Sequence, residues 1–306
     1  MIYTTVRDLS LSRISLGTAP FGSGIPQKNA FDILDRYLDM GGNLLDTAAV
    51  YGFGLSEQTI GAWMQERGLR HRVYISTKGC HPSLPDWKKR VNEEALRADL
   101  ENSLRNLKSD HTDIYFLHRD DEELPVSAIM PMLDRMVREG KILYLGASNW
   151  TTERIDEANA FARANGLAEF SVSQIMWNAA QINKSKVPDQ TLVIMDEAEH
   201  EGYLKNKIPV MAYTSQARGL FSHIREKGYD SLPASLSSVY LNDVTKERAE
   251  QILTIAKETG LSPTAISLAR LLRDSVTCLP IIGVSSVARL EESMQALSLP
   301  DQSFRT

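Results

Sequence analysis

The sequence contains little of what several classes of protein require. Its two cysteines, Cys80 and Cys278, lie far apart in the chain, so we expect neither a disulfide framework nor a metal knuckle. No apolar run approaches the roughly 18 residues of a membrane span, and residues 1–10 lack the apolar core of a signal peptide. Acidic residues (39) outnumber basic ones (34), which gives a net charge of -5 and no basic field for nucleic acid. We therefore expect a cytoplasmic protein that binds neither membranes nor nucleic acid.

Short β-branched or aromatic runs alternate along the chain with longer segments of helical period. In segment 92–108, for example, Leu96, Leu100 and Leu104 fall on one stripe of a predicted helix. Most runs start about 30 residues after the previous one, which leaves room for one crossover helix in each βαβ unit. This alternation predicts an α/β fold, a (β/α)8 TIM barrel that forms one domain over residues 1–306. The runs cover residues 14–16, 43–46, 73–77, 113–117, 142–146, 171–175, 208–213 and 278–282.

Two stretches lie outside this alternation. Residues 1–13 are expected to form a short β-hairpin that closes the barrel floor, and 216–246 a long loop after the seventh strand, a candidate lid or binding segment. The alternative fold is an open doubly wound sheet. It is less favoured because no strand precedes a complete G-x-G-x-x-G turn, and the nearest approach, 52–57, has Glu57 in place of the third glycine.

Four side chains of different proton chemistry follow neighbouring strands at the end where barrel enzymes carry their sites: Asp46, Tyr51, Lys78 and His118. A tyrosine hydroxyl, with a free pKa of about 10, donates its proton poorly at neutral pH unless a cation stabilises the phenolate. Lys78 is a candidate for that cation, Asp46 for its partner, and His118 for a donor to the same substrate oxygen. Such a set protonates an oxygen that is gaining negative charge. With no thiolate, no metal ligands and no Ser–His pair, hydrolytic mechanisms lose support.

The motifs around these residues resemble the aldo-keto reductase superfamily, in a bacterial-type form. The resemblance runs in family order through NLLDTAAVYG (43–52), STK (76–78), LHR (117–119), GASN (146–149), AY (212–213), RGL (218–220) and PIIG (280–283). It implies a (β/α)8 barrel and NAD(P)H-dependent reduction of aldehydes or ketones, sugar-like ones included, by direct hydride transfer. Tyr51 is then the general acid, Lys78 and Asp46 activate it, and His118 orients the carbonyl.

The same resemblance implies a cofactor site. Ser148, Asn149 and Gln174 match the positions that hold the nicotinamide carboxamide, and Tyr213 matches the ring that stacks on it. Gly283 replaces a lysine of many NADP-preferring relatives and Ser293 replaces the usual asparagine, so Arg289 is the cation left for a 2′-phosphate. NADP(H) is therefore preferred over NAD(H), and 216–246 becomes a candidate cofactor lid. Ser215, Gln216, Arg218 and Gly219 match the pyrophosphate segment, and Gly283, Ser285, Ser286, Arg289, Glu292 and Ser293 the adenosine end.

The predicted partner is a small carbonyl compound, and the sequence predicts no oligomeric state. Candidates for the substrate pocket are Phe21, Trp87, Arg119 and Trp177, and the acidic run at 120–123 inclines the prediction toward hydroxylated substrates. Two other functions stay open. One is a Schiff-base aldolase-type barrel that uses Lys78, and the other is a cofactor-binding regulatory subunit with little turnover.

Overall fold

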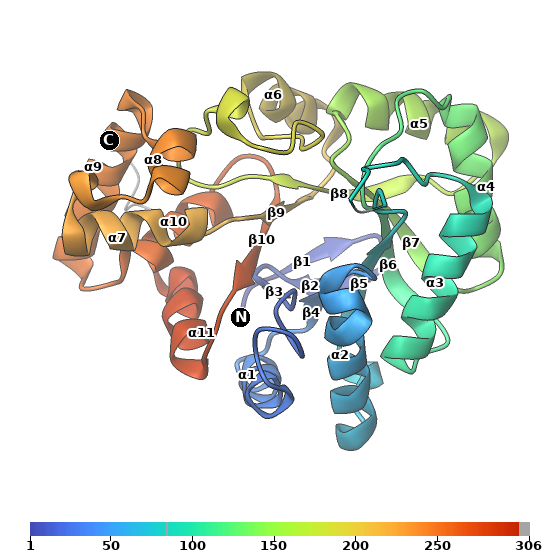
Figure 1. Cartoon of the computed structure of the whole chain (residues 1–306), viewed down its shortest axis with the longest axis horizontal. Coiled ribbons are helices and arrows are strands. Elements are labelled where there is room, and N and C mark those ends of the chain that lie inside the picture. The colour runs from blue at the N-terminus through green and yellow to red at the C-terminus, as the bar shows by residue number, and fades with distance from the viewer. Residues whose placement is uncertain (84, 300–306) are drawn as a thin grey trace.

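The computed structural model describes residues 1–83 and 85–299, and its centre is a closed barrel of parallel strands (Figure 1). Each of the eight predicted runs contributes one strand, and β10 pairs with β3 to close the ring, so the predicted barrel is confirmed. The strands are β3 (Ser15–Gly17), β4 (Leu44–Asp46), β5 (Tyr74–Gly79), β6 (Thr112–Leu117), β7 (Ile142–Ser148), β8 (Phe170–Met176), β9 (Val210–Tyr213) and β10 (Cys278–Gly283).

Helices surround the barrel (Figure 1). Several of them begin where the sequence supplies a capping side chain. Asn92, Thr151 and Ser286 each accept a hydrogen bond from a backbone N–H of the first turn. Among residues 1–83 and 85–299, no helix combines the length and the apolar composition of a membrane span. The helices are α1 (Gln27–Asp39), α2 (Leu55–Arg67), α3 (Glu93–Leu107), α4 (Val126–Arg138), α5 (Thr152–Asn165), α6 (Glu197–Asn206), α7 (Leu220–Lys227), α8 (Ala234–Tyr240), α9 (Asp243–Thr259), α10 (Pro263–Leu272) and α11 (Val287–Met294).

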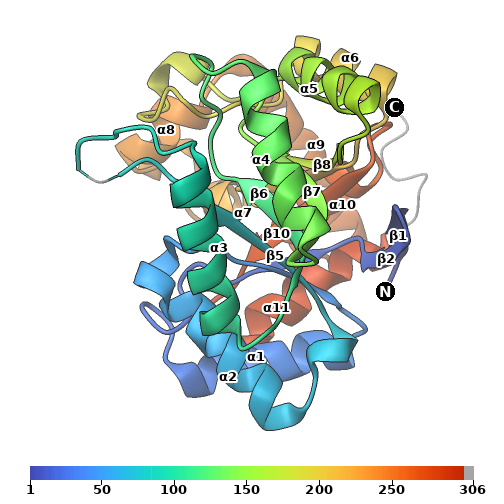
Figure 2. The ribbon, with the colours of Figure 1, turned by 90° about the vertical axis from the view of Figure 1, so that its right-hand side faces the viewer.

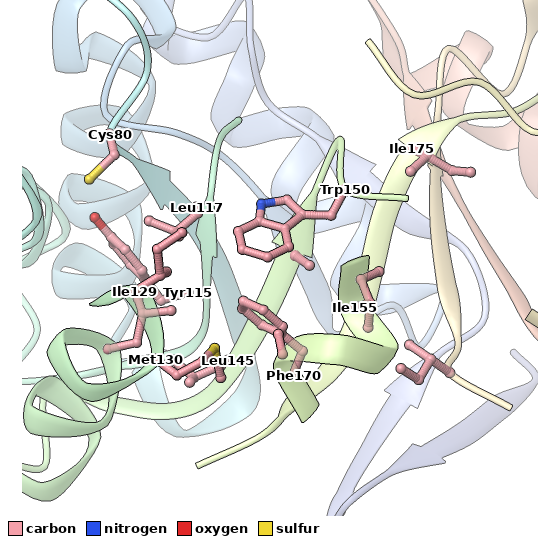
Figure 3. Close-up of a cluster of buried hydrophobic side chains, with 14 of the residues drawn as sticks. Cys80, Tyr115, Leu117, Ile129, Met130, Leu145, Trp150, Ile155, Phe170 and Ile175 are labelled. Atoms are coloured by element: carbon pink, nitrogen blue, oxygen red, sulfur yellow. The ribbon is translucent and has the colours of Figure 1, made fainter. Parts of the chain in front are cut away.

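The strands are apolar on both faces because one face fills the barrel and the other packs against helices. Ile114 and Phe116 of β6 belong to the interior cluster, whereas Tyr115 and Leu117 pack outward. Figure 3 shows the outer layer, in which Tyr115 and Leu117 lie beside Ile129 of α4. Because successive side chains of β6 point to opposite faces, this strand contributes both to the interior cluster and to the outer layer.

An N-terminal hairpin closes one end of the barrel, as the sequence predicts. Strands β1 (Tyr3–Val6) and β2 (Leu9–Ser12) pair antiparallel, and Val6, Leu9 and Leu11 join the interior cluster. Figure 2 shows this hairpin at the end of the barrel opposite α8. The hairpin does not cover the other end of the barrel, where the parallel strands finish and where barrel enzymes carry their functional sites.

Segment 216–246 is largely helical and not the long loop expected from the sequence. It contains α7, α8 and the start of α9. Phe221 and Ile224 of α7 and Leu236 and Tyr240 of α8 are buried at helical spacing in one apolar cluster. The helices form because this spacing gives each of them an apolar face to bury. The role of the segment as a cofactor lid stays a prediction.

The contact between α2 and α3 predicts an unusual response to a helix-stabilising substitution. A Cβ at Gly61 would lie 2.2 Å from the carbonyl oxygen of Asn106. Replacing an interior helical glycine by alanine ordinarily adds stability, but here the methyl group meets backbone that cannot rotate away. We expect Gly61→Ala to lower the free energy of unfolding by about 1–3 kcal/mol, measured by chemical denaturation. Gln65→Ala, on the exposed face of the same helix, is the control, and a more stable Gly61→Ala variant would contradict the packing described.

Candidate functional site

A cavity of about 860 Å³ opens at the carboxyl ends of the parallel strands, where barrel enzymes carry their sites. Its wall extends from Tyr51 and His118 at one end to Arg289 and Glu292 at the other. The strands meet there, so side chains that are distant in the sequence share one surface. The predicted site residues on this wall are Asp46, Tyr51, His118, Arg119, Ser148, Asn149, Gln174, Tyr213, Ser215, Gln216, Arg218, Gly219, Gly283, Ser285, Arg289, Glu292 and Ser293.

A buried ion pair lies beneath this wall. The Nζ of Lys78 donates to Asp46 Oδ1 (2.9 Å), Asp46 Oδ2 (2.8 Å) and the carbonyl oxygen of Thr47 (2.7 Å). Lys78 and Asp46 are 1% and 3% exposed. Asp46 Oδ1 also accepts from Ser76 Oγ and Gln174 Nε2, both at 2.9 Å. Burial lowers the pKa of Lys78, but Asp46, and after it Tyr51, together outweigh burial and the net pKa is raised. Lys78 is therefore a cation at neutral pH.

Tyr51 and His118 stand next to this cation. Their rings lie edge to face with centroids 5.9 Å apart, and Lys78 Nζ is 5.0 Å from the centroid of the Tyr51 ring. Burial raises the pKa of Tyr51 while the charge of Lys78 opposes the rise, so the net shift is upward and the phenol stays protonated at neutral pH. Burial, then the charges of Lys78 and Arg119, hold the pKa of His118 well below its usual value, so its imidazole is neutral. The four predicted catalytic side chains thus lie together.

Asn149 connects the loops around this end of the cavity. Its Nδ2 donates to the carbonyl oxygen of His118 (3.3 Å) and to Ser148 Oγ (3.1 Å). Its Oδ1 accepts from Tyr213 Oη (2.7 Å) and from the backbone N–H of Val193 (3.2 Å). Asn149 has a φ of 58°, the left-handed backbone that asparagine tolerates better than most residues. The turn after β7 therefore points the amide at three neighbouring segments.

Gln216 joins the carboxyl end of β10 to α11 at the far end of the cavity. Its Oε1 accepts from the N–H of Gly283 (2.9 Å), and its Nε2 donates to Ser293 Oγ (3.1 Å). The neighbouring Ser215 Oγ donates to the carbonyl oxygen of Ile281 (2.6 Å). These bonds fix the segment after β9 against the last barrel strand.

The far end also carries charged residues from α7 that the sequence analysis did not assign. Arg289 Nη1 donates to Glu292 at 2.7 Å, and this bond raises the pKa of Arg289. Glu226 acts electrostatically on Arg289, and Glu226, Lys227 and His223 line the same cavity. They were missed because 216–246 was interpreted as a loop. The spacing of 223, 226 and 227, three to four residues apart on one helical face, was the available signal.

Three of the predicted pocket residues are placed elsewhere. Phe21 and Trp177 are buried among apolar side chains, and Trp87 contacts His81 with ring centroids 5.9 Å apart. Among the described residues, the cavity wall includes none of these three. The side chains of Phe21 and Trp177 are packed into the apolar clusters instead. Arg119 does line the cavity and pairs with Asp189 at 3.0 Å.

Two further predictions are changed by local hydrogen bonding. The acidic run offers little to a substrate, because Asp120 pairs with Arg154 at 3.1 Å and Asp121 with Lys89 at 2.8 Å. Ser286 lies outside the wall described for the cavity, and its Oγ instead accepts from the backbone N–H of Arg289 at 3.3 Å as the cap of α11.

Comparison with known proteins identifies the family of this chain. The model of the aldo/keto reductase family matches residues 13–306. The chain belongs to the aldo/keto reductase family. It is therefore a member of a family of oxidoreductases that act on small carbonyl compounds with a nicotinamide nucleotide.

Similar proteins match nearly the whole chain. The norsolorinic acid reductase of Aspergillus flavus is 28% identical over 312 residues, which cover 97% of this chain and 76% of that protein. An aryl-alcohol dehydrogenase of Pestalotiopsis microspora is 28% identical over 302 residues, 96% of this chain and 75% of its own length. The aldo-keto reductase ausK of Aspergillus calidoustus is 30% identical over 314 residues, 96% and 75% respectively.

The ion pair predicts a stability effect with a definite pH dependence. Asp46→Asn removes the largest influence that raises the pKa of Lys78, and Tyr51 is uncharged at neutral pH, so we expect burial to bring the folded-state pKa below the unfolded value. We expect the free energy of unfolding at pH 7 to drop by about 3–5 kcal/mol, because a buried charge loses its partner. The unfolded variant then binds the Lys78 proton more tightly than the folded one, so its stability rises with pH toward the unfolded lysine pKa.

In the native protein, the contribution of this pair to the free energy of unfolding changes with pH in the opposite direction. The contribution of Lys78 is fully present at neutral pH and is lost as pH rises through its raised folded-state pKa. Denaturant titrations of both proteins at several pH values measure the difference. Glu291→Gln, which breaks an exposed pair with Arg36, is the matched control and costs under about 1 kcal/mol. Equal stability of Asp46→Asn and the native protein would contradict the assignment.

Proposed function

We propose that this protein reduces an aldehyde or ketone to an alcohol, with NADPH as the preferred cofactor and Tyr51 as the general acid. One observation carries the proposal. The buried cation Lys78 is held by Asp46 beneath a cavity and stands 5.0 Å from the Tyr51 ring, with neutral His118 beside it. Such a group of side chains protonates an oxygen that gains negative charge.

In the proposed mechanism, His118 and Tyr51 hydrogen-bond the carbonyl oxygen of the substrate. The nucleotide, when bound, supplies the hydride that makes the carbonyl carbon an alcohol carbon. Tyr51 Oη gives its proton to the oxygen, and Lys78 stabilises the phenolate that remains. Asp46 keeps Lys78 charged and fixed, so the cation does not have to move during the reaction.

The chemistry of the cavity wall supports a nicotinamide nucleotide as the cofactor. Ser148, Asn149 and Gln174 would hold the carboxamide, and Tyr213 would stack on the ring. Both amide groups already make internal hydrogen bonds, to Tyr213 Oη and Asp46, so binding would exchange partners at these positions. The pyrophosphate would lie along Ser215, Gln216, Arg218 and Gly219, and the adenosine end along Gly283, Ser285, Arg289, Glu292 and Ser293.

The state of Lys78 argues against the Schiff-base alternative. A Schiff-base lysine needs a lowered pKa to act as a neutral amine. Lys78 has a raised pKa, and its ammonium makes three hydrogen bonds to Asp46 and Thr47. A regulatory subunit would bind nucleotide without turnover, which the experiment below separates from an enzyme.

The names of two relatives suggest where to look for a substrate. One is named a norsolorinic acid reductase and another an aryl-alcohol dehydrogenase. Aromatic aldehydes and ketones are therefore the first class to assay. The acidic run at 120–123 gives no reason to favour sugar-like compounds, because Asp120 and Asp121 are engaged by Arg154 and Lys89.

The proposed acid is tested by Tyr51→Phe. We expect kcat for aldehyde reduction to fall by about 10²-fold or more, the usual contribution of a general acid. Since the pKa of Tyr51 is raised, the native rate should persist through neutral pH and fall only at strongly alkaline pH, where the phenol ionises. Oxidation of NADPH followed by absorbance measures both. Tyr3→Phe, at the exposed hairpin, is the control. Native-like turnover by Tyr51→Phe would refute the assignment, and nucleotide binding without any turnover in the native protein would favour the regulatory subunit.

The proposed cofactor preference is tested at the far end of the cavity. Arg289→Ala removes a cation from the 2′-phosphate site, and Glu226→Gln removes an acidic group that acts on Arg289. We expect Arg289→Ala to weaken NADPH binding about tenfold with little effect on NADH, and Glu226→Gln to strengthen NADPH binding about threefold, in line with partly exposed charge interactions. Fluorescence titrations with each nucleotide at two salt concentrations measure the dissociation constants. A ratio of NADPH to NADH affinity that neither variant changes would contradict the placement of the 2′-phosphate.

A further inference from the structure

His81 has a fixed tautomer that the proposed mechanism does not use. Its Nδ1 lies 2.8 Å from the carbonyl oxygen of Pro82. A carbonyl oxygen can only accept, so Nδ1 carries the proton and donates it to Pro82. In a neutral imidazole the other nitrogen, Nε2, is then an acceptor. The hydrogen bond to the backbone thereby makes Nε2 of His81 a hydrogen-bond acceptor.

This acceptor lies beside the proposed reaction centre. His81 lines the cavity, and its ring centroid is 4.7 Å from that of His118 in an edge-to-face contact. Trp87 also contacts the His81 ring, with the two ring centroids 5.9 Å apart. Across the described parts of the chain, His81 Nε2 has no hydrogen-bond partner from the protein. A polar atom at the cavity is thus left for a ligand.

The surroundings keep the imidazole neutral. Burial lowers the pKa of His81, and the positive charges of Arg119 and Arg90 add to this. The hydrogen bond to Pro82 and the charge of Asp189 act in the opposite direction, but the net shift is downward. His81 Nε2 therefore keeps its lone pair at neutral pH.

We propose that His81 is a substrate-recognition residue, whose Nε2 accepts a hydrogen bond from a hydroxyl group that the substrate carries near its reacting carbonyl. This assignment rests on the proposed function, which places the carbonyl oxygen at Tyr51 and His118. The neighbouring Arg119 does not supply such an acceptor, because its guanidinium only donates and already binds Asp189, Thr191 and the carbonyl oxygen of His118. The substrate class is hydroxylated carbonyl compounds, and a site built to bond a hydroxyl discriminates against the analogue that lacks its proton.

Direct binding tests the proposal without requiring turnover. The probes are 3-hydroxybenzaldehyde and 3-methoxybenzaldehyde, whose rigid rings hold the oxygen substituent at a fixed distance from the carbonyl. Calorimetric titration gives the dissociation constant of each probe. We expect the native protein to bind the hydroxyl compound about tenfold more tightly than its methyl ether, the effect of one hydrogen bond of ordinary strength.

Substitutions at His81 test whether the ratio of the two dissociation constants depends on the acceptor Nε2. His81→Phe and His81→Leu both lack an acceptor, and we expect the ratio to fall to about one in each. His81→Gln retains an acceptor oxygen and should retain part of the preference. His71→Phe, at an exposed histidine on the turn 70–72, is the matched control and should keep the native ratio.

Two results would overturn the assignment of His81. One is equal affinity of the native protein for the two probes, and the other is a hydroxyl preference that persists in both His81→Phe and His81→Leu. Failure of the proposed function appears separately, as absence of NADPH or NADH oxidation with either aldehyde. The two failures are distinguishable because the first is measured by binding and the second by turnover.

Discussion

The pair of Lys78 and Asp46 is the constraint on which the site depends. Removing two charges from water costs several kcal/mol per ion, and the cost is recovered only when every donor and acceptor is well placed. Here the ammonium makes its three hydrogen bonds to Asp46 and Thr47, and the carboxylate also binds Ser76 and Gln174. The carboxylate thereby ties the ends of β4, β5 and β8 together at one point.

One fixed charge acts on two neighbours in different ways. The positive charge of Lys78 lowers the pKa of Tyr51 against the effect of burial, and it also lowers the pKa of His118. The first effect makes a phenolate less costly to form, and the second keeps the imidazole uncharged. A single buried cation can therefore suit both a proton donor and a neutral hydrogen-bonding partner, provided that it does not move.

The sequence predicts the barrel well because its strands leave a strong local signal. Runs such as 113–117 are apolar on both faces, and spacings of about 30 residues leave room for one crossover helix. Asp46, Lys78 and His118 were predictable for the same reason, because each follows or ends a recognisable strand. Their placement needs only the rule that parallel strands present their carboxyl ends at one edge.

The rest depends on packing that no local pattern reveals. Phe21 and Trp177 were expected in the pocket as aromatic residues near strand ends, but whether such a side chain turns inward is decided by the neighbours that it meets. Glu226 was missed because its helix was interpreted as a loop. The sequence analysis gave His81 no role, and its tautomer is fixed by one hydrogen bond to the next residue. A feature that depends on a single contact cannot be predicted from the periodicity of the sequence.

The closure of the barrel has a consequence for synthesis on the ribosome. Strand β3 leaves the ribosome well before its second neighbour, β10, which ends at Gly283. Until then β3 presents an open edge, and the hairpin of β1 and β2 has no completed interior to cover. Pairing over so long a separation is slow, so the nascent chain stays exposed to association with other chains until β10 has been made. Rapid docking of β10 beside β3, more than early folding of the first strands, then shortens the time for which this edge is open.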